Sequence, residues 1–381
     1  MRELIFRLAR PMMRLLGRDE RGAIGVLIAV LIGGGVLIGM GALAIDVGQI
    51  YQNRAELQNG ADAGALAVAD SCALGTCSTG IAPKYATGNA SNLTGGYAGV
   101  DLVCGSGTGM TPCTTGNDGT HVNCPANPAA GTNYVDVHTS TLTAGGSTLL
   151  PPEFARTLLG NKGYAGTNVK ACAQAQWGAP TSANTIAYTI SACSWYVYTS
   201  NGTNFAQPPP YPPNTPPAPS YDHIMFEHGS QGSKTTGCPP YQPSGQDAPG
   251  NFGWTNDSGS CSTFINNGTY GGSTGASAAA DCKTVIQNAY ANKTVVYLPV
   301  YSAITGTGNN VTYTLLGFGA FVITGYHITG SFKAPDWLNS ANNCTGNNFC
   351  IDGYFTQGLI PSTGGLGGGN GLGASIVKLT G

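Results

Sequence analysis

Twelve cysteines are the side chains whose type and spacing most directly indicate a chemistry. All of them lie beyond residue 71: Cys72, Cys77, Cys104, Cys113, Cys124, Cys172, Cys193, Cys238, Cys261, Cys282, Cys344 and Cys350. An even number of cysteines is typical of a disulfide framework in an oxidising compartment. Short separations predict local Cys72–Cys77 and Cys344–Cys350 pairs, and the other pairings stay open. No C-x-x-C pair or histidine at zinc spacing accompanies them, so we expect structural disulfides and no metal site.

Short motifs that resemble catalytic sites lack the context that catalysis requires. Residues 271–275 match G-x-S-x-G, but the preceding INNGTY is not the apolar strand of a nucleophile elbow. A strand would place His223 and Glu227 on one face and His228 on the other. Residues 257–260 (DSGS) lack the spacing of a D-x-S-x-S metal-adhesion motif. We therefore expect no catalytic residue, no cofactor and no enzymatic activity.

The composition indicates a β-rich protein with few charges. Only 9% of the residues are charged, with 16 lysines and arginines against 18 acidic residues, whereas about 25% is typical of globular proteins. A net charge of −2 excludes the basic surface of a nucleic-acid-binding protein. Because 41% of the residues are hydrophobic and 18 are tyrosines, the chain is not expected to be disordered.

The N-terminal region has the charge pattern of a membrane anchor. Residues 1–21 hold six arginines against three acidic residues, and residues 22–45 contain no charged residue. A helix over this segment would be about 36 Å long, enough to cross a hydrocarbon core of about 30 Å. The basic flank predicts a single-pass protein with a cytoplasmic N-terminus and residues 46–381 outside. Residues 42–44 (ALA) resemble a signal-peptidase site, but the preceding apolar run is longer than that of a signal peptide.

Residues 46–70, which we call the stem, predict an amphipathic continuation of this helix. Small or apolar residues recur three and four positions apart, and no proline interrupts residues 42–70. One helix over residues 22–70 would have an apolar half in lipid and an outer half that packs on a globular head. This is the layout of a pilin-type stem.

The N-terminal segment resembles one known family. The residues that carry the resemblance are Arg21, Gly22, Asp46, Tyr51, Arg54, Leu57, Gln58, Ala61, Asp62 and Ala65. Their order is similar to the N-terminal pattern of the TadE/TadG-like Flp (Tad) pilus-assembly family. Gly60 and Gly64 stand where that family usually has alanine, and its usual membrane proline is absent. The long head resembles TadG-related proteins, without the von Willebrand A motif that some of them carry.

The resemblance implies a membrane-anchored component of Flp/Tad-type pilus assembly or secretion, with a structural or accessory role at the cell envelope. Its expected partners are the membrane and other proteins of that apparatus, with no nucleic acid and with any small-molecule ligand unknown. Neither Gly17 nor Gly22 is followed five residues later by the glutamate of a prepilin-peptidase site. The alternative is a membrane-tethered extracytoplasmic enzyme or ligand-binding module, in which scattered residues such as Glu153, His138 and Asp257 would converge.

The rest of the chain predicts an α+β fold, in which the long N-terminal helix precedes a mostly antiparallel, disulfide-rich β head. We expect strands at 134–141, 169–177, 185–199, 294–304, 310–331, 350–360 and 374–379, and helices at 153–159 and 277–290. A TGTGN turn makes a hairpin of residues 294–331. The predicted regions are a basic cytoplasmic tail (1–21), a transmembrane helix (22–45), the stem (46–70), an α/β head region (71–180), a strand region (181–206), a proline-rich strap (207–220), a β-rich cysteine-containing region (221–362), and a glycine-rich loop with a C-terminal strand (363–381).

Overall fold

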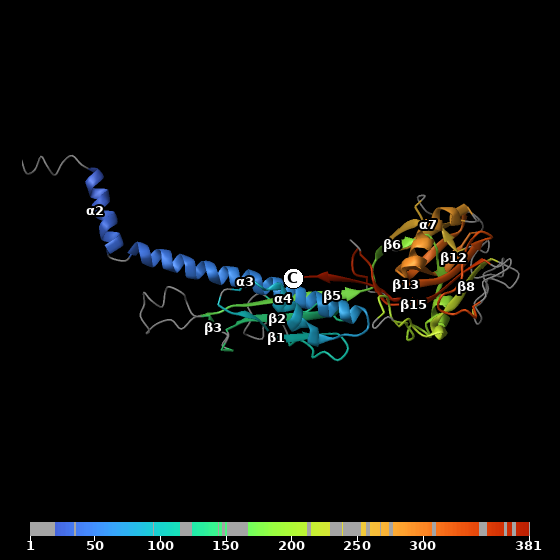
Figure 1. The fold of residues 1–381 in the computed structure, drawn as a ribbon, viewed down its shortest axis with the longest axis horizontal. Coiled ribbons are helices and arrows are strands. Elements are labelled where there is room, and N and C mark those ends of the chain that lie inside the picture. Colours follow the sequence, from blue (N-terminus) through green and yellow to red (C-terminus); the bar gives the residue numbers. More distant parts are fainter. Residues whose placement is uncertain are drawn as a thin grey trace, which may run out of the picture.

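In a computed structural model, the protein is elongated, and two N-terminal helices project from a head that contains two larger β-sheets (Figure 1). The structure describes residues 20–33, 36–93, 95–114, 124–143, 145–146, 149–150, 167–211, 215–228, 238, 253–256, 260–266, 268–273, 277–306, 310–342, 349–361, 364–367 and 371–380. Helices combine with mainly antiparallel strands, in agreement with the predicted α+β class. The helix predicted at 153–159 lies outside the described residues.

The single helix predicted over residues 22–70 is two helices in the structure. α2 spans Glu20–Gly33 and α3 spans Val36–Ala73, and the two residues between them lie outside the described part of the chain. The apolar segment is therefore divided: α2 has 14 residues, which make about 21 Å of helix, and the apolar start of α3 ends at Asp46. Among the helices that the structure describes, none is both long enough and apolar enough to cross a membrane.

The outer part of α3 packs on a five-stranded sheet, which we call the first sheet. Its strands, in spatial order, are β1 (Tyr97–Gly105), β2 (Asn133–Leu142), β5 (Lys170–Gly178), β17 (Ala374–Leu379) and β16 (Gly358–Leu359). The pairs are antiparallel except β16 and β17. Ala61 and Ala65 of α3 share a buried cluster with Val137 of β2 and Ala173 of β5. This confirms the predicted strands at 134–141, 169–177 and 374–379.

A short helix, α4 (Ala82–Asn89), follows the 3-10 turn η1 (Thr79–Ile81) and lies very close to α3. A Cβ atom on Gly60 would lie 2.7 Å from the carbonyl oxygen of Ala86, and one on Gly64 would lie 3.4 Å from that of Ala82. Residue 60 has to be glycine for the backbones to approach this closely. The contact with α4 therefore accounts for Gly60, whereas a Cβ atom on Gly64, the other departure from the family pattern, would make only an ordinary contact with α4.

The second sheet has eight strands and a different set of neighbours. Five of its strands are neighbours in the order β7 (Ile190–Ser191), β12 (Val295–Thr305), β13 (Thr312–Thr329), β11 (Thr269–Ser273) and β9 (Trp254–Thr255). Two further strands, β14 (Phe332–Ala334) and β15 (Phe349–Thr356), also pair with β13. The last strand, β8 (His223–His228), pairs with β15. β12 and β13 form the predicted hairpin, with a register shift beside Gly317. Two smaller ribbons pair β6 (Ser182–Ile186) with β10 (Ser262–Asn266), and β3 (Leu149–Leu150) with β4 (Thr167–Asn168).

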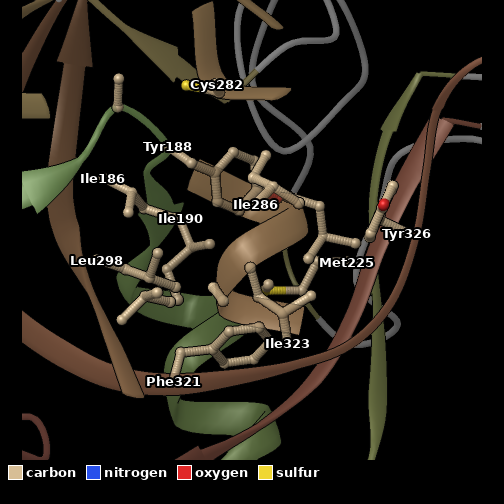
Figure 2. Close-up of a cluster of buried hydrophobic side chains, with 14 of the residues drawn as sticks. Ile186, Tyr188, Ile190, Met225, Cys282, Ile286, Leu298, Phe321, Ile323 and Tyr326 are labelled. Carbon is tan, nitrogen blue, oxygen red and sulfur yellow. The ribbon is translucent and has the colours of Figure 1, made fainter. Parts of the chain in front are cut away.

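Helix α7 (Ser277–Asn292) covers one face of the second sheet and confirms the helix predicted at 277–290. Its Ile286 points into a buried cluster with Leu298 of β12 and with Phe321 and Ile323 of β13 (Figure 2). Nonpolar side chains packed in this way hold the helix on the sheet, because their burial removes apolar surface from water.

The chain passes between the two sheets at residue 357, where one strand was predicted. Residues 350–360 form not one strand but two: β15 belongs to the second sheet and β16 to the first. β17 then completes the first sheet beside β5, and its Ile376 shares a buried cluster with Tyr313 and Phe318 of β13. The two sheets therefore have a common apolar core between them.

The strand predicted over residues 185–199 is wrong in its second half. Residues Ala192–Tyr198 form a helix, α6, and a second 3-10 turn, η3, covers Pro219–Tyr221. Ser191 caps α6, since its Oγ accepts a hydrogen bond from the Ser194 N–H at 2.9 Å. Trp195 is buried, and its Nε1–H donates to the carbonyl oxygen of Leu372 at 3.0 Å. The cap and this tertiary contact outweigh the strand preference of the aromatic residues.

Five cysteine pairs lie at disulfide distance. They are Cys72–Cys77, Cys104–Cys113, Cys124–Cys172, Cys193–Cys238 and Cys261–Cys282. The first confirms a predicted local pair. Cys350 is also disulfide-bonded, and Cys344, its predicted local partner, lies outside the described residues. No cysteine in the described part of the chain is free.

Candidate functional site on the stem helix

Several residues of the family motif connect α3 to the head through apolar contacts. Leu57, Ala61 and Ala65 are fully buried. Leu57 shares a small cluster with Ala171 of β5, while Ala61 and Ala65 lie in the larger cluster with Val137 of β2. Their four-residue spacing places them on one side of the helix. This part of the motif is therefore used within the molecule.

Polar residues of the same segment add hydrogen bonds to the first sheet. The Nε2 of Gln58 donates to Oδ1 of Asp62 at 2.8 Å and to the carbonyl oxygen of Cys172 at 3.0 Å. From the sheet, the Thr139 hydroxyl donates to the carbonyl oxygen of Leu57 at 3.0 Å. These bonds fix the register of α3 on β2 and β5.

The remaining motif residues of α3 have a different environment. Tyr51 is 71% exposed and Arg54 is also exposed, whereas Asp46 is buried. Arg21 and Gly22 belong to α2, and the structure describes no side chain there. Tyr51 and Arg54 are thus available for contacts outside the head.

Many of the described apolar side chains of α2 and of the first turns of α3 are exposed, although Ala42 among them is buried. The large ones are 41–67% exposed: Ile24, Val26, Leu27, Ile28, Val30, Ile32, Met40, Leu43, Ile45 and Val47. Monomeric soluble proteins rarely expose contiguous apolar patches of this extent. The surface has the chemistry to contact lipid or the apolar faces of other helices.

Those of the residues weighed as catalytic that the structure describes belong to three different strands, β2, β8 and β11. Ser273 is the last residue of β11, where it pairs with Trp254 of β9. His223 of β8 stacks on the ring of Tyr198 with centroids 4.6 Å apart, and burial lowers its pKa. Glu227 and His228 are on the same strand, and their side chains lie outside the description. Glu153 and Asp257 lie outside the described residues.

His138 belongs to a buried polar group on the face of the first sheet that points away from α3. Cys104, Asp136 and His138 have possible ligand atoms within 4.8 Å of one another. Because Cys104 is bonded to Cys113, its sulfur is not available as a thiolate ligand. Burial raises the pKa of Asp136 to about 6, and a hydrogen bond with Gln174 acts in the opposite direction.

A second buried polar group lies on the second sheet, at the edge formed by β8 and β15. Asp222 precedes β8, Asp352 is in β15, and Asp336 and Asn342 follow β14. The Thr324 hydroxyl donates to Oδ1 of Asp222 at 2.6 Å. The sequence did not indicate this group, because its members are far apart in the chain and match no motif.

The carboxyls of this group share an environment of low polarity. Burial, followed by a hydrogen bond with Asp336, raises the pKa of Asp222 to about 9. Burial and the charge of Asp336 raise the pKa of Asp352 to about 7. Carboxyls held so close together, with little water, cannot all be ionised unless positive charge is supplied.

Comparison with curated proteins and with solved structures gave no significant match. Residues 22–71 match a family model described as "Putative Flp pilus-assembly TadE/G-like". The match covers most of α2 and α3 and contains every motif residue except Arg21, so it confirms the resemblance seen in the sequence. Residues 22–71 are therefore similar to the TadE/G-like family, and this similarity suggests an association with Flp/Tad pilus assembly.

Proposed function

We propose that this protein is a membrane-anchored, structural or accessory component of a Flp/Tad-type pilus or secretion apparatus. The observation that carries the proposal is the TadE/G-like family match over residues 22–71. Residues 22–45 lie in the cell membrane with the N-terminus in the cytoplasm, and the disulfide-bonded head lies outside. The role is assembly rather than catalysis.

Two features support the anchoring part of this proposal. Apolar side chains of α2 and of the start of α3, such as Ile24, Leu27 and Leu43, are exposed, and the larger buried cluster that α3 shares with the first sheet begins only at Ala61. The charges are also asymmetric, since residues 1–21 carry six arginines and residues 22–45 carry no charge. Such a basic flank is typical of the cytoplasmic side of a membrane span.

The partner contact is proposed to involve Tyr51 and Arg54. The other described motif residues of α3 are buried or bonded within the molecule, whereas these two are exposed one helical turn apart. Tyrosine and arginine are also the residue types enriched at the centres of protein interfaces. They would bind another protein of the apparatus next to the membrane surface.

Membrane fractionation tests the location. The full-length protein is expected in the membrane pellet and is expected to stay there after an alkaline carbonate wash, because a spanning segment is held by its apolar area. A shortened form that begins at Ile45 and is found in the medium would show that residues 1–44 are a cleaved signal instead.

Deletion and complementation test the role. Loss of the gene is expected to abolish surface pili or secretion, and the wild-type gene is expected to restore them. Tyr51→Ala and Arg54→Ala should restore them several-fold less well at equal protein level, because an interface anchor contributes more than about 1 kcal/mol. Gln52→Ala is the matched control, since Gln52 is an exposed neighbour outside the motif. Full complementation by both variants would contradict the proposed contact, and normal pili and secretion in the deletion strain would contradict the role.

A further inference from the structure

Four oxygen-bearing side chains converge beside the second sheet from three separate parts of the chain. Asp222 follows the turn η3, Asp336 and Asn342 lie in the segment after β14, and Asp352 is in β15. Asp222 and Asp352 are 7% and 2% exposed, while Asp336 and Asn342 are half-buried. The group therefore has a closed side toward the sheet and a partly open side at the loop.

The amide of Asn342 lies between two of the carboxylates. Its Nδ2 donates to Oδ2 of Asp336 at 3.1 Å and also to Oδ2 of Asp222. The other oxygen of Asp336 accepts hydrogen bonds from the backbone N–H groups of Leu338 and Asn339 at 2.8 and 2.9 Å. These bonds hold the Asp336 carboxylate in place with Oδ2 directed toward Asp222 and Asn342.

Asp352 supplies an independent observation. Its Oδ1 is buried, and no residue in the described part of the chain forms a hydrogen bond with it. Its Oδ2 approaches Asp336 across Gly325: a Cβ atom on Gly325 would lie 2.9 Å from this oxygen and 2.9 Å from the Cα of Asp336. Gly325 therefore lets the two acidic residues approach each other closely, because a Cβ atom at this position would collide with both. An ionised carboxylate oxygen buried without a partner is costly, which indicates that something else satisfies it.

We propose that this group, Asp222, Asp336, Asn342 and Asp352, is a calcium-binding site. All four side chains offer oxygen, which is the ligand that Ca²⁺ takes in proteins, whereas zinc and copper favour sulfur and nitrogen. The inference does not depend on the proposed role in pilus assembly. The ion would connect the residue after the turn η3, the loop after β14 and the strand β15.

The arrangement of the ligands decides how the ion is held. Asp222, Asp336 and Asp352 are not among the groups whose ligand atoms all lie within 4.8 Å of one another. The Asn342 amide contacts Oδ2 of both Asp222 and Asp336, so these three residues would bind the ion directly. Asp352 would be reached through a coordinated water, as is common for Ca²⁺. Rotation of the Asn342 amide by half a turn places its Oδ1 where Nδ2 now lies, which replaces a donor by a ligand.

Thermal unfolding of the full-length protein in detergent tests the site. Millimolar Ca²⁺ is expected to raise the Tm by about 5 °C over the value in EDTA, because a ligand that binds only the folded state stabilises it. Asp352→Asn and Asp222→Asn should reduce this rise to less than half. The matched control is Asp101→Asn, which changes an exposed carboxylate on β1 of the first sheet and should retain the full rise. Asp352→Asn removes a buried charge without changing shape, so its Tm in EDTA should not fall.

Luminescence provides a second measurement that does not rely on stability. Terbium is a probe of calcium sites, and Trp337 directly follows Asp336, with its backbone N–H donating to the Thr324 carbonyl oxygen at 3.1 Å. Excitation of tryptophan should therefore sensitise terbium emission, and Ca²⁺ should displace it more effectively than Mg²⁺. Absence of both the Tm rise and the emission in the wild-type protein would overturn the proposal. So would an unchanged response in Asp352→Asn and Asp222→Asn, or equal responses to Ca²⁺ and Mg²⁺.

Discussion

The close approach of α3 and α4 predicts that Gly60→Ala destabilises the head, although alanine is the better helix former. A Cβ atom at this position would lie 2.7 Å from the Ala86 carbonyl oxygen and 3.2 Å from the Cβ of Ala90. An ordinary C···O contact is about 3.3 Å, so α4 would have to move by about 0.6 Å. The atom in the way belongs to the backbone of α4, so a change of side-chain rotamer cannot relieve the contact.

The change in the free energy of unfolding of Gly60→Ala is the difference between two opposing effects. Overpacking of a well-packed contact costs about 1–3 kcal/mol, and replacing a helical glycine by alanine stabilises by about 0.5–1 kcal/mol. We expect a net loss of about 1–2 kcal/mol in the free energy of unfolding. Gly64→Ala should cost less, because its nearest contact is a side-chain methyl, Cγ1 of Val137 at 3.3 Å, which can shift.

Gly88→Ala is the matched control. Gly88 lies on the exposed side of α4, and a Cβ atom there would meet nothing within 4 Å. The same substitution should therefore stabilise by about 0.5–1 kcal/mol. Urea unfolding of the full-length protein in detergent, followed by circular dichroism, measures all three variants against wild type. A Gly60→Ala protein as stable as Gly88→Ala would refute the packing argument.

Three further predictions concern buried groups of the head. Burial raises the pKa of the Asp136 carboxyl to about 6, so the folded protein favours the protonated carboxyl and loses stability as pH rises from about 4 to about 6. Asp136→Asn keeps this group neutral at every pH. In urea unfolding the variant should therefore be about 2 kcal/mol more stable than wild type near pH 7, but not near pH 4. Cys261→Ser with Cys282→Ser, which removes a disulfide with a sequence separation of 21, should lower the free energy of unfolding by about 3 kcal/mol. Trp195→Phe should cost about 1–2 kcal/mol, because the Leu372 carbonyl oxygen loses its buried donor; equal Tm values for the variant and wild type would contradict this.

The local sequence pattern was sufficient to predict those helices and strands whose conformation depends mainly on residues nearby in the chain. The four-residue spacing of Leu57, Ala61 and Ala65 predicted the buried side of α3, because helix geometry places such positions on one face. The helix at 277–290 was also predicted from a short stretch of sequence. The hairpin of residues 294–331 was predicted from the TGTGN turn between its two strands. The likeness of the first helices to a pilus-assembly family was also present in the sequence, since its residues are consecutive in one segment.

Only the tertiary structure decided which distant segments meet. β17 pairs with β5 although nearly 200 residues separate them in the chain, and the run predicted as one strand at 350–360 is divided between two sheets. Trp195 lies in a helix because Leu372, far along the chain, accepts its hydrogen bond. The carboxylates of Asp222, Asp336 and Asp352 come together through strand pairing and a loop, and their separations in the sequence do not predict that contact. Local conformational preference can be found within a short window of residues, whereas burial and pairing depend on the whole fold.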